Sequence, residues 1–387
     1  MPCTILKNIA TCFSLSVLKF PAVIFLSYTR ANVPMFTYQH YVPIMKAEEG
    51  EMAALSELTE QTAAQFTPML VFAAPDDMPG ALTKEQLEEY LALLTSLTGG
   101  KWPFKHPVFI DLLCMHTTKN EEINPVEFIF DELEKQGIQA VPVITFSCSE
   151  EFKNQVADVH KKFKRGVCIR IVDQDFGVVS VQNLLQEILK TVGCKREEVD
   201  IVLDYKTVHA SLQYAIFASA IYRLNALPHL QQWRTITIAG VSYPTYIKQV
   251  REILNQMPRV EWNIWKDILK TPIKRLPAFG DYDTFHPIHP DRDPRDTKEN
   301  PRLRYTIEGS WLVLNNEDIH TLSAAEFKKI CKELVESGAF CGKDFSWGDN
   351  FIYNIAQGKV HEDRDVLWRK ACTNHHVTFI TTALKNL

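Results

Sequence analysis

The sequence lacks the short motifs that mark several large enzyme classes. Its 387 residues contain no G-x-x-x-x-G-K-[ST] or G-x-G-x-x-G loop, no H-E-x-x-H helix and no G-x-S-x-G turn. A nucleotide-cradling loop, a zinc protease and a serine hydrolase elbow are therefore not expected. The nine cysteines never form a C-x-x-C pair, which argues against a zinc ribbon and a disulfide framework. We expect a reducing, cytoplasmic compartment.

Strong charge and long apolar runs are also missing. The net charge of −5 gives no general attraction to a phosphate backbone, so we expect no general nucleic-acid binding. The short basic stretch 161–165 is typical of a helix end, where cations interact favourably with the helix dipole. Roughly 20 unbroken apolar residues would be needed to cross a bilayer, and no such run is present, so no membrane span is expected.

The first 34 residues differ from the rest, because they hold three basic residues and no acidic one. Their apolar stretch from 11 to 26 is interrupted by Lys19 and a proline, and no small-residue cleavage site follows it. Met35 stands just before the first expected strand. We favour a non-native upstream extension with translation starting at Met35. A membrane-associating tail and a cleaved signal peptide stay open as alternatives.

From residue 41 onward, short apolar runs alternate with amphipathic helical patterns. Eight β-branched runs lie at 41–46, 67–72, 107–113, 139–146, 166–172, 199–205, 234–241 and 276–282. Helical patterns lie at 51–66, 84–97, 125–136, 149–163, 181–192 and 211–224. Nearly continuous apolar runs are expected of parallel strands that are covered on both faces.

Eight such units within about 240 residues match the body of an eightfold barrel. We predict an α/β fold, a (β/α)8 TIM-like barrel over 35–283. An open doubly wound sheet is the alternative, but it usually carries a glycine-rich first turn that this sequence lacks.

The character of the chain changes after residue 283. Proline and charge dominate 286–302, which we expect to be a loop, and 304–315 is typical of a hairpin with its turn near Gly309. Helical patterns follow at 324–337, 350–356 and 366–371. We predict an appended C-terminal α+β subdomain over 284–387.

Polar residues end several of the otherwise apolar strands. They are Lys46, Asp111, Arg170, Asp204, Ser242 and Asp281. In a barrel these positions lie near the carboxyl-terminal face, where active sites of this architecture are built. Carboxylates with a lysine and an arginine suit a divalent cation or a phosphate-bearing ligand. The same acidic and basic side chains could instead neutralise one another, and neither a metal nor a cofactor can be named.

Two further groups contain residue types that bind metals or act in catalysis. His286, His289, Asp291, Asp293 and Asp296 share one proline-rich loop, for which a solvated loop is favoured over a metal site. Near the C-terminus, Asp349, His375 and His376 are further candidates. Adjacent histidines on a regular element point in different directions, so His375 and His376 should not face one site. We expect that one could reach the barrel mouth while the other is structural.

Several segments, taken in order, resemble the beta protein family of satellite phages and prophages. They are YVPIMK, GVCIRI, ALPHLQQWRTITIAG, FGDYD, LRYT, DFSWGD and TNHHVTF. The resemblance covers roughly 41–384. One departure is AGVSYP at 239–244, where the family has two small hydroxyl residues before Phe-Pro; it weakens Ser242 as a site residue.

The resemblance implies a genetic context and carries no catalytic residues with it. Members of the family are encoded beside a host-killing gene in mobile elements, which implies a component of a toxin–antidote or anti-phage defence cassette. The expected partner is the toxic protein encoded next to it, which it would neutralise. The alternative function, drawn from the strand-end residues, is a metal- or phosphate-dependent hydrolase of nucleotide or phosphodiester substrates. Whether the protein is an enzyme stays open.

Overall fold

The computed structural model describes residues 36–72, 83–102, 106–113, 124–172, 175, 180–243, 254–287, 303–314, 323–361 and 364–387. The extension 1–34 and four members of the proline-rich loop group (His289, Asp291, Asp293 and Asp296) lie outside these ranges. Within the described ranges, none of the helices combines the length and the apolar character that crossing a bilayer requires.

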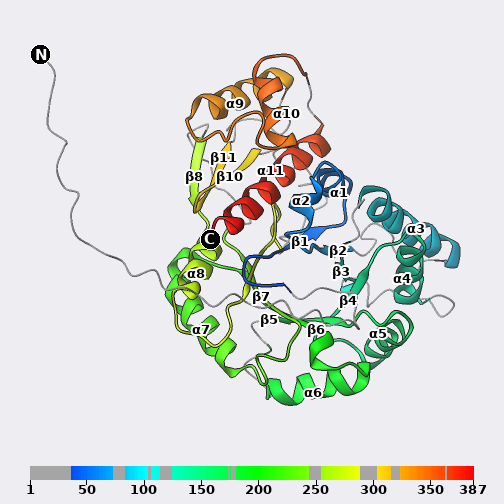
Figure 1. The fold of residues 1–387 in the computed structure, drawn as a ribbon. Coiled ribbons are helices and arrows are strands. Elements are labelled where there is room, and N and C mark those ends of the chain that lie inside the picture. Colours follow the sequence, from blue (N-terminus) through cyan, green and yellow to red (C-terminus); the bar gives the residue numbers. More distant parts are fainter. Residues whose placement is uncertain are drawn as a thin grey trace, which may run out of the picture. The chain divides into compact units, whose positions relative to one another are not determined.

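Eight parallel strands close into a barrel (Figure 1). They are β1 (Tyr41–Lys46), β2 (Met69–Val71), β3 (Val108–Asp111), β4 (Ala140–Ile144), β5 (Val167–Val172), β6 (Val199–Thr207), β7 (Thr235–Val241) and β9 (Ala278–Asp281). The ring closes where β1 pairs in parallel with β9, with Tyr41 opposite Phe279. Seven of the strands lie within one predicted apolar run each, β6 continues two residues past its run, and the predicted (β/α)8 TIM-like barrel is confirmed.

Helices surround the barrel. They are α1 (Glu49–Leu55), α2 (Glu60–Ala63), α3 (Lys84–Lys101), α4 (Pro125–Lys135), α5 (Glu150–Phe163), α6 (Val181–Val192), α7 (Gln213–Ala226) and α8 (Val260–Leu269), with short 3₁₀ turns η3 (Arg196–Glu198) and η4 (Ala210–Leu212). Side-chain caps fix where some of them begin: Asn124 Oδ1 accepts a hydrogen bond from the Val126 amide, and Ser149 Oγ accepts one from the Phe152 amide. The basic stretch 161–165 covers the end of α5, as predicted.

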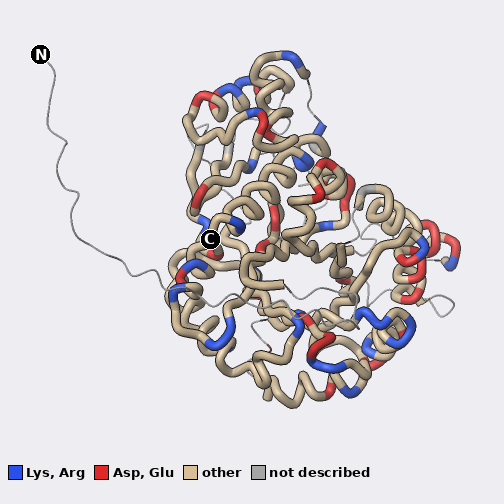
Figure 2. The backbone as a smooth tube through the Cα atoms, viewed as in Figure 1, with Lys and Arg blue, Asp and Glu red and all other residues tan. Residues whose placement is uncertain are grey.

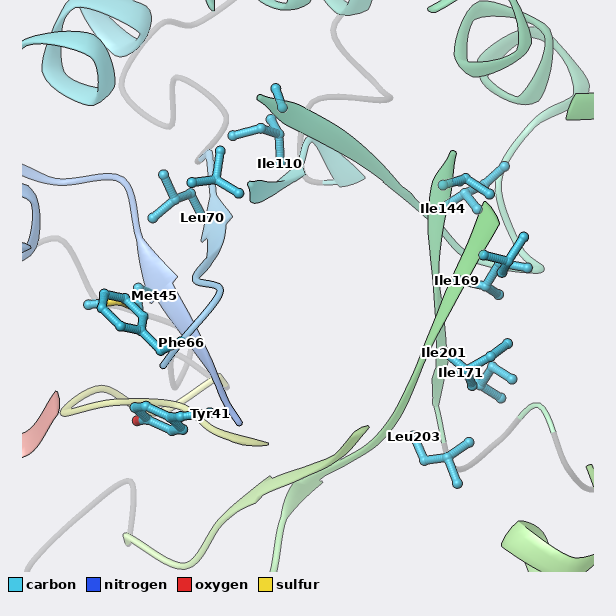
Figure 3. Packing of buried hydrophobic residues seen from close by; sticks show 14 of the residues in the cluster. Tyr41, Met45, Phe66, Leu70, Ile110, Ile144, Ile169, Ile171, Ile201 and Leu203 are labelled. Atoms are coloured by element: carbon cyan, nitrogen blue, oxygen red, sulfur yellow. The ribbon is translucent and has the colours of Figure 1, made fainter. Parts of the chain in front are cut away.

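Alternation along the strands separates the two faces of the barrel wall. Ile169, Ile201 and Leu203 point outward into the layer between strands and helices (Figure 3). Cys168 and Val202, one position away, belong to a separate cluster on the inner face. Residues 200 and 204 share the inner face with Val202, so β6 places one aspartate near each end of the barrel interior.

The C-terminal region contains a three-stranded antiparallel sheet in the order β10-β11-β8. Strands β10 (Leu303–Ile307) and β11 (Ser310–Leu314) form the predicted hairpin, and Gly309 in its turn has a φ of +67°. Strand β8 (Leu254–Pro258) comes from the connection between β7 and β9, so the sheet takes a strand from residues before 283.

Three helices complete this region: α9 (Ala324–Glu336), α10 (Trp347–Ala356) and α11 (Asp365–Lys385). Helix α11 lies beside both α1 and the small sheet (Figure 1). Its residues Val377, Ile380 and Leu384 belong to the same buried cluster as the outer face of the barrel, which attaches the C-terminal region to the barrel.

Candidate functional site

Arg170 joins two aspartates at the carboxyl-terminal end of the barrel. Its Nη1 donates to Asp111 Oδ2 at 2.6 Å, and its Nε and Nη2 donate to Asp204 Oδ2 at 2.9 and 2.7 Å. The Tyr282 hydroxyl accepts a hydrogen bond from Nη2 at 2.6 Å and donates one to Asp204 Oδ2 at 2.7 Å. Strands β3, β5 and β6 and the residue after β9 thus build one cluster, which we call the mouth cluster.

The backbone satisfies the two remaining carboxylate oxygens of the mouth cluster. Asp111 Oδ1 accepts from the Leu113 amide at 2.9 Å, and Asp204 Oδ1 accepts from the Lys206 amide at 2.8 Å. All four carboxylate oxygens therefore already accept hydrogen bonds from the protein. With one guanidinium and two carboxylates, the cluster carries one excess negative charge.

Burial sets the protonation state of the tyrosine in this cluster. The two aspartate side chains are 1% and 0% exposed, and that of Arg170 is 11% exposed. Burial raises the pKa of Tyr282 well above its usual value, and the negative charge of Asp204 raises it further. The hydroxyl is therefore a neutral donor to Asp204.

Lys46 is on the inner face of β1, together with Val42 and Ile44 of the inner cluster. Its Nζ lies 3.4 Å from Glu48 Oε1 and 5.7 Å from the centroid of the Phe285 ring. Lys46 is thus at the expected end of the barrel, and its described partners are Glu48 and Phe285 instead of the mouth aspartates.

Asp281 does not join the mouth cluster, although β9 brings it to the same end of the barrel. Phe279, two positions earlier on the same face of the strand, packs against Trp262 and Trp265 of α8 in the outer layer. Asp281 shares that outward orientation. The following residue, Tyr282, faces inward and reaches Arg170 in its place.

The partners of Asp281 come from β1, from α11 and from the residue before α8. Tyr41 donates its hydroxyl to Asp281 Oδ1 at 2.5 Å, while His376 Nε2 and Arg259 Nη2 lie 3.0 and 3.2 Å from Oδ2. Burial by itself would raise the pKa of Asp281, but the histidine and the arginine outweigh it and hold that pKa below its usual value. Burial lowers the pKa of His376, so its ring is neutral and donates through Nε2.

His375 makes a second, separate pair with Asp349. The distance from its Nδ1 to Asp349 Oδ2 is 2.9 Å, and both side chains are fully buried. Asp349 also accepts from the Tyr305 hydroxyl at 2.6 Å and from Ser346 Oγ at 2.5 Å. Burial opposes ionisation of Asp349, but these donors together hold its pKa below the usual value.

The two histidines contact different groups of the same residue of β10. His375 Nε2 donates to the Thr306 carbonyl at 2.9 Å, and His376 Nδ1 lies 2.7 Å from the Thr306 hydroxyl. Adjacent on α11, the histidines contact different carboxylates, as their spacing predicts. Their described partners are buried groups that tie α11 to β10 and to the outer face of the barrel, and neither histidine bonds to the mouth cluster.

Ser242 follows β7 and stabilises the start of α8. Its hydroxyl accepts a hydrogen bond from the Val260 amide at 3.1 Å and donates to the Pro258 carbonyl at 3.0 Å. Its own amide donates to Glu261 Oε2 at 3.0 Å. These contacts give Ser242 a capping role for a helix that begins almost 20 residues later, instead of a place beside Arg170.

His286 is the one described member of the proline-rich loop group. Its Nε2 lies 3.1 Å from the Thr207 hydroxyl at the end of β6, which brings it to the barrel mouth end. Across the described ranges, no three or more histidine, cysteine or acidic side chains have a geometry that could hold a metal ion.

Sequence reasoning missed one buried acid near this end of the barrel. Asp283 adopts a left-handed backbone conformation with φ of +48° and is 1% exposed. Its Oδ2 accepts a hydrogen bond from the Thr373 hydroxyl of α11 at 2.7 Å. Burial raises the pKa of Asp283 to about 8, against the Thr373 hydrogen bond, and the nearby charge of Glu51 contributes to the rise.

Tyr282 was also missed, although its signal was in the sequence. It follows Asp281 in FGDYD, and strand alternation sends one of the two residues inward and the other outward. Choosing between them required knowing that Phe279 faces the helices. Arg259 could not have been found in this way, because it precedes a helix that the apolar pattern did not reveal.

Comparisons with known proteins place the chain in a family. No curated protein matches the chain. Among solved structures, SacUVDE is 12% identical and covers 62% of this chain and 92% of its own, with a TM-score of 0.30. A mutant tryptophan synthase alpha-subunit from Pyrococcus furiosus is 10% identical and covers 45% of this chain and 81% of its own, with a TM-score of 0.24.

The family comparison agrees with the segments noted in the sequence. A model of the family described as "Beta protein" matches residues 41–382, which include all eight barrel strands and most of the C-terminal region. The chain belongs to the beta protein family.

Proposed function

We propose that this protein acts by binding another protein, and that its partner is the toxic product of a gene encoded beside it. In this proposal it is the neutralising component of a satellite-phage or prophage toxin–antidote or defence cassette and works in the cytoplasm of the host cell. Family membership supports the genetic context. The chemistry of the barrel mouth supports binding over catalysis.

One observation carries the choice between the two mechanisms. Each of the four oxygens of Asp111 and Asp204 already accepts a hydrogen bond from Arg170, Tyr282 or a backbone amide. A divalent cation would bind through such oxygens, but the Arg170 guanidinium already donates to both carboxylates and its positive charge would repel a second cation there. A phosphate would meet a cluster with one excess negative charge. The hydrolase alternative therefore has less support from the described residues.

The test uses two aspartates on one face of one strand. Asp204→Asn alters the mouth cluster, whereas Asp200→Asn alters the ion pair with Arg234 at the opposite end of β6. Each variant is co-expressed with the toxic neighbour, and growth is compared with the amount of folded, soluble protein. If neutralisation depends on binding, both variants rescue growth in proportion to the folded protein present.

A catalytic mouth gives a different result. Asp204→Asn would then lose neutralisation by a factor of about 10²–10⁴ in rate, while the less stable Asp200→Asn would keep it for each folded molecule. That outcome would overturn the binding mechanism. A direct pull-down of purified wild-type protein with the toxic product adds a second criterion, because failure of wild type to associate would reject the proposal outright.

A further inference from the structure

Helix α7 (Gln213–Ala226) covers the barrel wall but leaves large apolar side chains in solvent. It buries only Ala220 and Leu224, whereas Tyr214 is 87% exposed and Tyr222 is 72% exposed. Leu212, immediately before the helix, is 50% exposed. Exposed aromatic groups gathered on one element are typical of interaction surfaces, and tyrosine is enriched in protein interfaces.

The same helix has almost no charge. Arg223 is its one charged residue, and the Arg223 guanidinium lies over the Tyr205 ring at 5.1 Å. No acidic residue occurs anywhere from 205 to 243, although acidic residues outnumber basic ones in the whole chain, 47 to 42. Figure 2 shows no acidic colour along α7, in contrast to the neighbouring helix α6. Two copies of this face could therefore meet with little repulsion.

Three exposed residues of α7 form a stripe that reads the same in both directions. Tyr214, Ala218 and Tyr222 are spaced four residues apart, which places them along one side of a helix. Exposed polar side chains flank the stripe, Asn225 near the end of α7 and Ser211 in the 3₁₀ turn η4 before it. The order is polar, tyrosine, alanine, tyrosine, polar.

A surface with this symmetry is complementary to itself. A two-fold interface brings the same patch of both subunits together, so that each residue meets its counterpart across the axis. Two antiparallel α7 helices crossing at Ala218 would place Tyr214 of one copy beside Tyr222 of the other. The small side chain at the crossing point allows the close approach, about 8–10 Å between axes, that packed helices require.

We propose that α7 is the interface of a homodimer whose two-fold axis passes beside Ala218. This inference does not depend on the proposed function. The helix is about 21 Å long, so we expect a small contact compared with the interfaces of permanent dimers. The dimer should therefore be weak and reversible.

Sedimentation velocity of the full chain, from low to several hundred micromolar, tests the proposal. We expect a monomer of 44.4 kDa that shifts to twice that mass as the concentration rises. The double variant Tyr214→Ser/Tyr222→Ser should weaken dimerisation at least about tenfold with an unchanged melting temperature, because both side chains are exposed. Leu93→Ser is the matched control, since Leu93 is 55% exposed on α3, away from the stripe.

A cross-linking variant tests the symmetry itself. In a Cys341→Ser background, which removes an exposed thiol, Ala218→Cys should form an intermolecular disulfide under mild oxidation, because two residues at a two-fold axis come within the required Cα separation of about 4.4–6.8 Å. Leu93→Cys in the same background should not. A monomer at every concentration, or a dimer that the tyrosine substitutions leave unchanged, would overturn the proposal.

Discussion

The two ends of β6 use the same residue types for different electrostatic results. At the amino end, Asp200 pairs with Arg234 through two hydrogen bonds of 2.5 and 3.0 Å, and the Thr235 hydroxyl donates a third at 2.6 Å. At the carboxyl end, Asp204 shares Arg170 with Asp111. One end is neutral, and the other keeps an uncompensated negative charge.

Exposure follows the same division. The Arg234 side chain is 3% exposed, whereas that of Arg170 is 11% exposed. In barrels of this architecture, residues at the amino end generally serve stability, while those at the carboxyl end face the binding side. A buried aspartate–arginine pair therefore does not by itself indicate either a structural or a functional role. The two ends of β6 differ in the ratio of acidic to basic side chains and in the exposure of the arginine. The amino end is a neutral, buried structural pair, whereas the carboxyl end is a negatively charged cluster closer to solvent.

The largest expected effect is at the amino end. Asp200→Asn leaves the Arg234 guanidinium buried without a carboxylate, and breaking such a pair costs about 3–5 kcal/mol. Urea unfolding of the variant against wild type measures this loss. A loss no greater than that of Asp204→Asn would show that the amino-end pair contributes no more to stability than the carboxyl-end cluster, which would contradict the distinction drawn between the two ends.

Asp204→Asn should cost less, about 1–3 kcal/mol of unfolding free energy. Arg170 keeps Asp111 as a partner, and the substitution removes the excess negative charge. The same urea titration measures it, with the far-ultraviolet spectrum as a control for the native fold. A loss greater than that of Asp200→Asn would contradict the prediction.

The free energy of unfolding should also depend on pH, because of the Asp283 side chain near the carboxyl-terminal end of the barrel. The Asp283 carboxyl, which has a pKa of about 8 in the folded protein against 3.8 as its ordinary value, binds a proton in the folded state throughout the interval between them. Stability therefore falls as pH rises across this interval, by at most about 1.4 kcal/mol per pH unit. Unfolding measured between pH 5 and pH 8 should show a flatter slope for Asp283→Asn, and equal slopes would refute the assignment.

The smallest effects concern one hydroxyl at each end. Tyr282→Phe removes a donor from Asp204, and Thr235→Val removes a donor from Asp200. Each aspartate keeps its arginine, so each substitution should cost only about 0.5–1.5 kcal/mol. The melting temperatures of the two variants, compared with that of wild type, check this. A much larger loss for Tyr282→Phe would mean that the mouth cluster depends on its tyrosine more than on its charges.

The sequence predicted the barrel because its signals are local. Each strand is a short apolar run, and the starts of α4 and α5 are marked by cap residues that act within three positions. The helical pattern at 366–371 was found but not its full extent, since α11 continues to Lys385 through residues buried on several sides. Burial all round leaves no polar stripe to reveal the helix period.

Strand β8 and helix α8 were not predicted at all. The residues of β8, LNQMP, have no clear alternation, and their partner strand β11 lies more than 50 residues later in the chain. Such a strand forms because another strand satisfies its backbone, which a local pattern does not record. The position of β8 brings Arg259 to Asp281 and places the Pro258 carbonyl beside the Ser242 hydroxyl.

The sequence by itself determined the eight strands, the end of the barrel at which the polar residues lie, and the chemical types present there. Only the tertiary structure decided that Arg170 binds Asp111, Asp204 and Tyr282 while Asp281 turns outward to Tyr41 and His376. The physical reason is that strand formation depends on neighbours along the chain. Which face of a strand is buried, and which charges meet there, depends on elements brought together from distant parts of it.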